Sequence, residues 1–237
     1  MSDTQIWLIT GTSRGIGLEL VKQLAATPSY VVIATCRNPT KALALKELAD
    51  AAKGRIHIVA LDVTDDKSVK ESVAQVTAIV GSHGIDYLVS NAGINDGGDD
   101  RPSLMDLSVL QHVFDTNVVA PARIYQAYLP LVMKSTKKTI VNVSSALGSI
   151  TLARGPIYTS YSTSKAALNM LTYKEHAEHP DLTVISMQPG HLKTDLGGPS
   201  AQLDVDVGVA GVLNVVKSLK PDDSGKFFDY QGKELPW

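Results

Sequence analysis

The chain has 237 residues, enough for one large α/β domain, and no linker-like stretch divides it. A formal net charge of -2 gives no electrostatic footprint for nucleic acid or anionic lipid. No run approaches the ~18 apolar residues of a membrane span, and the first five residues lack the basic and apolar regions of a signal peptide. The single Cys36 cannot form an intrachain disulfide, which fits a reducing compartment. We expect a cytoplasmic protein with a small-molecule partner.

Short apolar runs rich in β-branched residues alternate with helix-like stretches along the chain. This pattern predicts a single doubly wound α/β domain over residues 1–237, with about seven mainly parallel strands and helices on both faces. We expect strands at residues 6–10, 30–35, 55–61, 85–90, 138–144, 182–187 and 226–228. We expect helices at residues 15–26, 41–52 and 66–81, a long one ending near Met133, and helices at 161–178 and 205–218. Thr64 or Asp65 is suited to cap the third helix.

A glycine-rich turn lies between the first strand and the first helix. Gly11, Gly15 and Gly17 leave room for backbone amides at a helix N-terminus to face a pyrophosphate without an intervening side chain. The spacing is G-x-x-x-G-x-G rather than the commoner G-x-G-x-x-G, so the triplet by itself is also compatible with a plain tight turn. Its place in a βαβ unit favours a nucleotide.

The same turn matches the nucleophile elbow of serine hydrolases, G-x-S-x-G, with Ser13 as the nucleophile. In such enzymes an oxyanion loop from an earlier strand completes the site. Only one short strand precedes Ser13, so no earlier loop can supply that amide. The sequence therefore disfavours a hydrolase.

Tyr161 and Lys165 stand four residues apart on a predicted helix and so share a face. An ammonium group near a phenol favours the ionised phenol and is expected to lower its pKa. A tyrosine tuned in this way is a usable general acid or base near neutral pH. Tyr158 has no lysine at the same spacing.

From end to end, the order of these motifs resembles that of a short-chain dehydrogenase/reductase. The matching residues are Gly11 to Gly17, Asp62-Val63, Asn91-Ala92-Gly93, Asn117, Ser144-Ser145, Tyr161 with Lys165, and Pro189-Gly190 with Thr194. The C-terminal segment, residues 224–237, further resembles carbonyl reductases similar to the Sniffer and C-factor proteins, and fungal ketoreductases of aromatic polyketides. The resemblance implies a Rossmann fold and, in many members, a homodimer or homotetramer.

The resemblance also implies catalytic roles at four positions. Ser145, selected because it stands three residues before Gly148, would hold the substrate carbonyl oxygen, and Tyr161 would deliver the proton. Lys165 would bind the nicotinamide ribose and lower the pKa of Tyr161, while Asn117 would hold a water that links Lys165 to solvent. For Asn117 alone, an ordinary solvent-exposed helix asparagine is the competing interpretation.

The cofactor-binding residues implied by the resemblance follow the ends of several strands. Asp62 would bind the adenine amino group with Val63 packed on the ring, although Asp62 could instead cap a helix. Thr194 would touch the carboxamide or the phosphates, although it too could be a helix cap. The full predicted set is Gly11, Ser13, Arg14, Gly15, Ile16, Gly17, Arg37, Asp62, Val63, Asn91, Ala92, Gly93, Tyr161, Lys165, Pro189, Gly190, Leu192 and Thr194. A short substrate loop is expected near residues 194–204.

The second predicted strand indicates which nicotinamide cofactor is used. An acidic residue at its end would accept from a ribose 2′-hydroxyl and select NAD. That strand ends instead in Cys36-Arg37, and Arg37, together with Arg14, is suited to a 2′-phosphate. We therefore expect NADP(H) and, because cells keep it mainly reduced, the reduction of a carbonyl compound.

Two alternatives stay open at this point. An NADP-binding sensor on the same fold would bind the cofactor without turnover, although it would not need the proton donor. A dehydratase or epimerase of related fold would usually have a larger C-terminal substrate region. The histidines lack the spacing of metal ligands, so no metal site is expected. The sequence does not determine which ketone, aldehyde or quinone is the substrate.

Overall fold

The computed structural model describes residues 4–237, and its centre is a seven-stranded parallel sheet with flanking helices. The strands follow the order β3-β2-β1-β4-β5-β6-β7, so the chain starts at the middle of the sheet, builds one edge and then the other. The strands are β1 (Gln5–Ile9), β2 (Tyr30–Cys36), β3 (Ile56–Ala60), β4 (Tyr87–Ser90), β5 (Thr139–Val143), β6 (Thr183–Gln188) and β7 (Phe227–Asp229). The predicted Rossmann fold is confirmed, and each predicted strand forms within two residues of its expected ends.

The helices also lie close to their predicted positions. They are α1 (Gly15–Ala25), α2 (Leu43–Ala51), α3 (Asp66–Val80), α4 (Leu107–Phe114), α5 (Ala120–Val132), α6 (Thr159–Glu178) and α7 (Val205–Ser218). One long helix was expected to end near Met133. It is divided instead into α4 and α5 by a π-helical segment, η2 (Asp115–Val119). Short 3₁₀ turns occur at η1 (Pro39–Lys41), η3 (Ala146–Gly148) and η4 (Pro221–Asp223).

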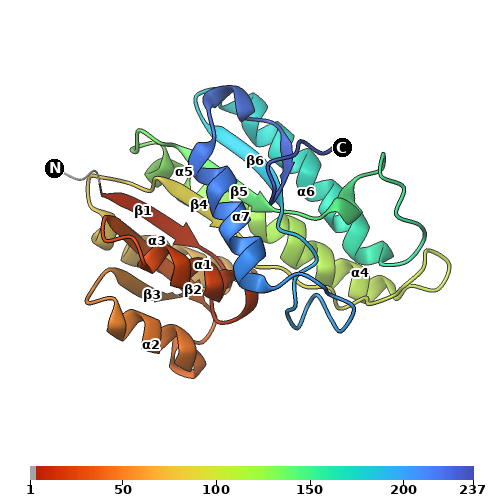
Figure 1. Ribbon diagram of the computed structural model, residues 1–237, viewed down its shortest axis with the longest axis horizontal. Helices are drawn as coiled ribbons and strands as arrows, with labels where there is room; N and C mark the ends of the chain where they lie inside the picture. The colour runs from red at the N-terminus through yellow and green to blue at the C-terminus, as the bar shows by residue number, and fades with distance from the viewer. Residues whose placement is uncertain (1–3) are drawn as a thin grey trace. The chain divides into compact units, whose positions relative to one another are not determined.

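The chain folds into two compact units. Unit 1 comprises the residues up to Ala92 together with Arg123–Ile140, and unit 2 comprises Gly93–Ala122 together with Val141–Trp237. Strands β1 to β3 and helices α1 to α3 form the red-to-orange part of Figure 1, which belongs to unit 1. The same figure shows α6, β6 and α7, which belong to unit 2, in teal to blue.

The core of unit 1 explains why its strands are almost entirely apolar. Strand β1 pairs in parallel with β2 along one edge and with β4 along the other, so both of its edges are hydrogen-bonded within the sheet. Trp7, Leu8 and Ile9 are fully buried. The Trp7 ring stacks on Tyr87 of β4, with centroids 3.8 Å apart and an interplanar angle of 9°. This packing aligns the ends of β1 and β4, where the glycine turn and Asn91 begin.

The C-terminal segment of unit 2 packs along its last strand. Leu235 donates a backbone hydrogen bond to Phe227, and the Trp237 ring stacks on the Phe227 ring at 5.6 Å. The hydroxyl of Ser149 donates to the carbonyl of Pro236 at 2.7 Å. The segment therefore contacts both β7 and the loop that follows η3.

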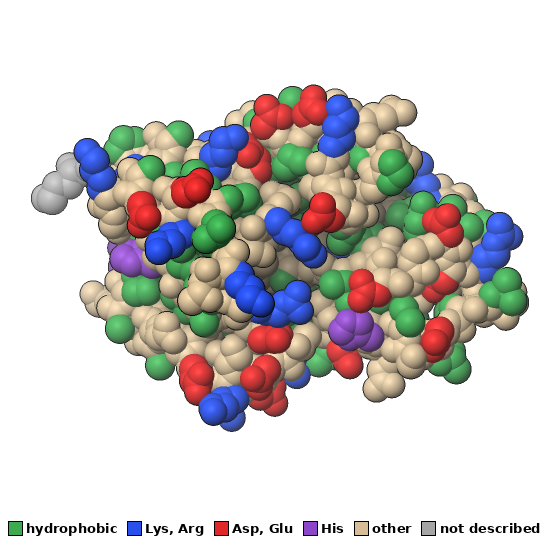
Figure 2. Space-filling view, turned by 90° about the horizontal axis from the view of Figure 1, so that it is seen from below, with side chains coloured by type: hydrophobic (Ala, Val, Ile, Leu, Met, Phe, Trp, Pro, Cys, Tyr) green, Lys and Arg blue, Asp and Glu red, His purple; other side chains and the backbone are tan. Residues whose placement is uncertain are grey.

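Acidic and basic side chains are interspersed over the face of the molecule in Figure 2. Over residues 4–237, no helix is both long and apolar enough to cross a membrane.

Candidate active site

Tyr161 and Lys165 both lie on the buried side of α6. Tyr161 is 9% exposed and Lys165 is 4% exposed, although each carries a polar end group. The Lys165 ammonium lies 5.5 Å from the centre of the Tyr161 ring, and its Nζ donates to the carbonyl oxygen of Val143 at 2.8 Å. The spacing of four residues therefore brings the two side chains together, as predicted.

Burial dominates the ionisation of this pair. It raises the pKa of Tyr161 to about 12, against the opposing effect of a hydrogen bond with Ser145. It also lowers the pKa of Lys165 to about 8. Lys165 was expected to lower the pKa of Tyr161, but desolvation of the phenol is the largest effect here and holds this pKa above its ordinary value. Tyr161 is therefore a neutral phenol at pH 7 and can donate a proton.

Ser145 and Ser144 face different surroundings, because successive residues of an extended chain point to opposite sides. Ser145 is the N-cap of η3, accepts a hydrogen bond from the Leu147 amide at 3.2 Å and forms a side-chain hydrogen bond with the Tyr161 phenol. Ser144 is buried and donates to the side-chain oxygen of Asn169 at 2.6 Å. Of the two serines, only Ser145 lies beside Tyr161.

The turn after Ser145 contacts α6 through Gly148. A Cβ at this position would lie 2.7 Å from the carbonyl carbon of Lys165 and 2.8 Å from the backbone nitrogen of Ala166. Only glycine lets the backbone of η3 approach the helix so closely. The same contact brings Ser145 near the helical turn that carries Tyr161 and Lys165.

Asn117 lies in the π-helical segment η2 and is fully buried. Its side chain accepts from the Ile94 amide at 2.9 Å and donates to the Ile94 carbonyl at 2.9 Å and to Ser164 at 3.0 Å. The alternative of a solvent-exposed helix asparagine is therefore wrong. Residue 121 is a proline and cannot give the Asn117 carbonyl the usual i+4 hydrogen bond. Single π-helical turns within α-helices often occur at functional sites.

The glycine turn of unit 1 is held closely by the end of β4. Gly11 has φ +72°, and a Cβ there would lie 2.9 Å from Ala92. A Cβ at Gly17 would lie 2.3 Å from the Gly11 carbonyl oxygen and 2.7 Å from the Asn91 amide nitrogen. Asn91 itself donates to the carbonyls of Thr10 and Gly11 at 2.9 and 3.2 Å. Asn91 therefore supports the turn through its side chain.

The N-terminus of α1 differs from those of α3 and α4. Asp65 and Asp106 cap α3 and α4 with side-chain hydrogen bonds, which confirms Asp65 rather than Thr64 as the cap of α3. Arg14 makes no such hydrogen bond at α1, and the first turn of α1 has no acidic residue. An uncapped helix N-terminus behind a glycine turn fits an anion such as pyrophosphate.

A cavity of about 470 Å³ in unit 1 lies beside this turn. Its lining residues are Ser13, Arg37, Asn38, Lys41, Ala42, Leu43 and Ala44. Ser13 and Arg37 were predicted from the sequence, whereas Lys41 was not. Lys41 ends η1 and provides a second cation four residues after Arg37. The sequence signal that could have identified Lys41 is its position only four residues after Arg37.

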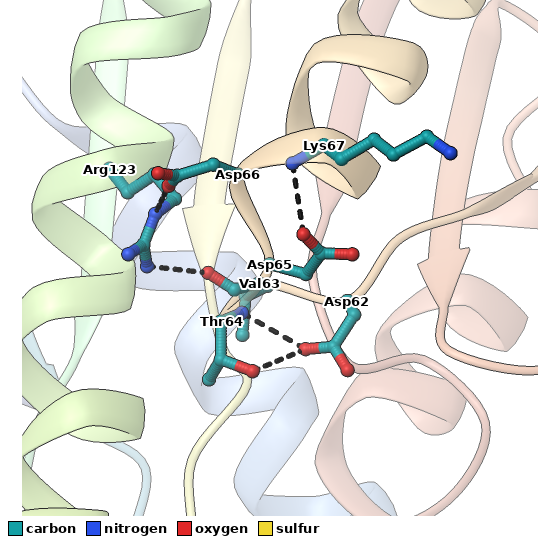
Figure 3. Close-up of polar contacts among 7 residues, drawn as sticks. All are labelled: Asp62, Val63, Thr64, Asp65, Asp66, Lys67 and Arg123. Carbon is teal, nitrogen blue, oxygen red and sulfur yellow. Dashed lines mark hydrogen bonds and ion pairs between the residues drawn. The ribbon is translucent and has the colours of Figure 1, made fainter.

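Asp62 lies in the turn between β3 and α3, which Figure 3 shows. Its Oδ1 accepts from the amide and the hydroxyl of Thr64 at 3.0 and 2.7 Å. Burial acts to raise the pKa of Asp62, but these hydrogen bonds and the charges of Arg37 and Arg123 lower it overall. Asp62 does not cap α3. It also gives Arg37 an acidic neighbour from the turn after β3, the strand that pairs with β2, and the sequence of β2 by itself does not reveal this neighbour.

Arg123 fixes the same turn from α5. It donates to the carbonyl of Val63 at 3.1 Å and forms an ion pair with Asp66 (Figure 3). The positions of Asp62 and Val63 therefore depend on a residue about 60 positions away in the chain.

The predicted residues after β6 form a closed loop in unit 2. Gly190 has φ +100°, and a Cβ there would lie 2.7 Å from Leu203. Leu192 pairs with Leu203, and Lys193 forms an ion pair with Asp204 at 2.7 Å. The Thr194 hydroxyl accepts from the Gly197 amide at 3.1 Å, so it stabilises a turn rather than a helix start.

The predicted residues thus fall into two groups. Unit 1 holds the glycine turn, Arg37, Asp62, Val63, Asn91 and Ala92 of the predicted cofactor set, and the other members of that set lie in unit 2. Unit 2 holds Asn117, Ser145, Tyr161 and Lys165, together with the loop after β6. Among residues 4–237, no group of His, Cys, Asp or Glu has the arrangement of a metal site.

Comparisons with known proteins agree with this arrangement. Residues 5–203 match the family model described as short chain dehydrogenase. An uncharacterized oxidoreductase from Schizosaccharomyces pombe is 34% identical over 258 residues, covering 100% of both chains.

Two solved structures extend the comparison. NADPH-bound carbonyl reductase from chicken fatty liver has a TM-score of 0.91 and 35% identity, covering 99% of this chain and 94% of that one. Carbonyl reductase Sniffer of D. melanogaster has a TM-score of 0.93 and 32% identity, covering 99% of each chain. The chain therefore belongs to the short-chain dehydrogenase family and is an oxidoreductase.

Proposed function

We propose that the protein is an NADPH-dependent carbonyl reductase that acts on a ketone, an aldehyde or a quinone. The observation that carries this proposal is the buried, neutral Tyr161 phenol in hydrogen-bond contact with Ser145. A neutral phenol beside a second hydroxyl is suited to protonate an oxygen that becomes negative during reduction. A protein that only binds a cofactor would not need this pair.

The residues of unit 1 fit NADP(H). Glycines occupy positions where a Cβ would obstruct the turn, and the amides of α1 lack a side-chain cap. Arg37 and Lys41 line one cavity and could both contact a 2′-phosphate, for which a guanidinium is well suited. Ser13, at the same cavity, is a further candidate donor. When bound, NADPH supplies the hydride.

Four residues of the chain would then manage the substrate oxygen and its proton. Ser145 would donate a hydrogen bond to the oxygen and orient the carbonyl, and Tyr161 would transfer its phenolic proton to it. Lys165, whose lowered pKa still leaves it mostly charged at pH 7, would stabilise the tyrosinate left behind. Asn117 would position the Ile94 segment and α6 through its three hydrogen bonds.

The test is oxidation of NADPH by the purified protein against a panel of aliphatic and aromatic ketones, aldehydes and quinones. We expect turnover with at least one class, and loss of that turnover in Tyr161→Phe. Tight NADPH binding with no turnover across the panel would favour a sensor on the same fold and would contradict the proposal.

A further inference from the structure

The helix that carries Tyr161 has an unusual beginning. The residue at its N-cap position is Tyr158, which has φ +60° and makes no side-chain hydrogen bond to the helix. Such a left-handed conformation is uncommon for a bulky residue and persists only where neighbouring structure enforces it. The first amides of a helix need partners from outside the helix. Because Tyr158 does not supply them, another part of the chain must.

Asp100, in the loop between β4 and α4, supplies these partners from about 60 residues earlier in the chain. Its carboxylate accepts from the Ser160 amide at 3.1 Å and also from the Ser160 hydroxyl. Its backbone carbonyl accepts from the Thr159 amide at 3.3 Å and the Thr159 hydroxyl at 3.2 Å. Asp100 therefore binds the first two residues of α6, and Tyr161 is the third.

The loop is shaped to allow this contact. A Cβ at Gly97 would lie 2.9 Å from the Asp100 carboxylate and 3.2 Å from Ser160, so a side chain there would push the two apart. Asp99, which directly precedes Asp100 in the loop, accepts a hydrogen bond from the Tyr158 phenol. Ser160 is fully buried, so water does not compete for its hydroxyl.

We propose that Asp100 is a positioning residue for Tyr161, because it anchors the two helical residues that directly precede the tyrosine. The inference rests on the proposed function, in which Tyr161 donates the proton. The ends of helices fray readily when their caps are lost. A displacement of about 1 Å at a reacting group can cost roughly 100-fold in rate. The contact therefore links the shape of the β4–α4 loop to the rate of proton transfer.

The competing explanation is an ordinary helix cap that adds stability and nothing else. Loss of such a cap would lower the melting temperature. At assay temperatures well below melting, it would leave kcat unchanged. A positioning residue changes kcat in fully folded protein, and it does so only when Tyr161 is present to be positioned. These two signatures separate the explanations.

The variants to compare are Asp100→Ala, Asp100→Asn and Ser160→Ala, measured with a carbonyl substrate from the panel. Asp96→Ala is the matched control, because Asp96 lies in the same loop but its side chain contacts His112 of α4 at 3.4 Å. We expect Asp100→Ala to lower kcat about 10- to 100-fold with little change in the dissociation constant of NADPH. Asp100→Asn keeps one acceptor oxygen and should retain more activity, and Asp96→Ala should match the unmodified protein.

The decisive comparison repeats Asp100→Ala in a Tyr161→Phe background. Residues that act as a unit are non-additive, so we expect Asp100→Ala to cause less than a two-fold further loss there. Unchanged kcat in folded Asp100→Ala, or an equal loss in both backgrounds, would overturn the inference. Should Asp100→Ala not fold, Ser160→Ala and Asp100→Asn decide the question by the same comparison. Full activity in Tyr161→Phe would instead overturn the proposed function itself.

Discussion

At the scale of single residues, two nearby tyrosines differ in environment. Tyr161 is buried beside Ser145 and Lys165, whereas the Tyr158 phenol contacts Asp99 near the surface. We expect Tyr161→Phe to lower kcat roughly 100- to 10,000-fold, the usual range for loss of a general acid, with NADPH binding retained. Tyr158→Phe should mainly alter KM. Steady-state kinetics of both variants check this, and the assignment would be wrong if Tyr158→Phe were the inactive one.

The two adjacent serines offer a second comparison at this scale. Ser145→Ala removes a donor to the reacting oxygen, which typically costs ~3 kcal/mol of transition-state stabilisation, so kcat should fall about 100-fold or more. Ser144→Ala should keep kcat but lose about 1 to 3 kcal/mol of unfolding free energy, because it removes the hydrogen bond to the buried Asn169. Kinetics and urea unfolding of both variants would separate the roles. Equal losses of kcat would refute the choice of Ser145.

At the scale of elements, the end of β2 and the turn η1 act together. Arg37 and Lys41 line one cavity, while Asp62 from the end of β3 lies close enough to Arg37 to be stabilised by its charge. We expect Arg37→Ala to weaken NADPH binding roughly 10- to 100-fold, equivalent to the 1.5 to 3 kcal/mol of a charge-assisted hydrogen bond. Lys41→Ala should cause a smaller loss. NADH binding should change little in either variant.

Titration of both reduced cofactors by nicotinamide fluorescence checks this prediction. Lys67→Ala is the control, because the Lys67 side chain is 82% exposed and pairs with Glu71 instead. If the unmodified protein bound NADH as tightly as NADPH at low salt, the roles given to Arg37 and Lys41 would have to be withdrawn.

At the scale of the whole molecule, Glu175 makes stability depend on pH. Burial raises its pKa to about 8, although the hydrogen bond from Asn142 opposes this and the charge of Glu178 adds to it. The folded state therefore holds a proton that the unfolded chain releases above its ordinary pKa of 4.5. The stability from this group is complete below pH 4.5 and is lost as pH rises toward 8. Glu175 Oε1 has no hydrogen-bond partner among residues 4–237.

Glu175→Gln tests this dependence, since glutamine imitates the protonated acid and can still accept from Asn142. The free energy of unfolding of the variant should exceed that of the unmodified protein by a margin that grows by about 2 to 4 kcal/mol from pH 5 to pH 8. Lys165 does not confuse the result, because its lowered pKa affects stability only between about pH 8 and 10.5. Urea unfolding at both pH values provides the measurement. A constant difference between the two proteins would contradict the assignment.

The sequence by itself determined the order of strands and helices, the glycine turn and the pairing of Tyr161 with Lys165. Each depends on neighbours within a few residues: period and β-branching for the strands, absent side chains for the turn, and the i, i+4 spacing for the pair. Asn117 was identified through its register with other motifs, but its burial could not be read from its own neighbours.

Only the tertiary structure decided the features that join distant parts of the chain. One such feature is the desolvation of Tyr161 and Glu175. Others are the place of Asp62 beside Arg37 and the long-range cap by Asp100. Burial depends on what packs over a group, and a hydrogen bond across 60 residues depends on how the loops fold back. Neither leaves a pattern in local sequence, because the partner and the depth of burial are set only when the chain is packed.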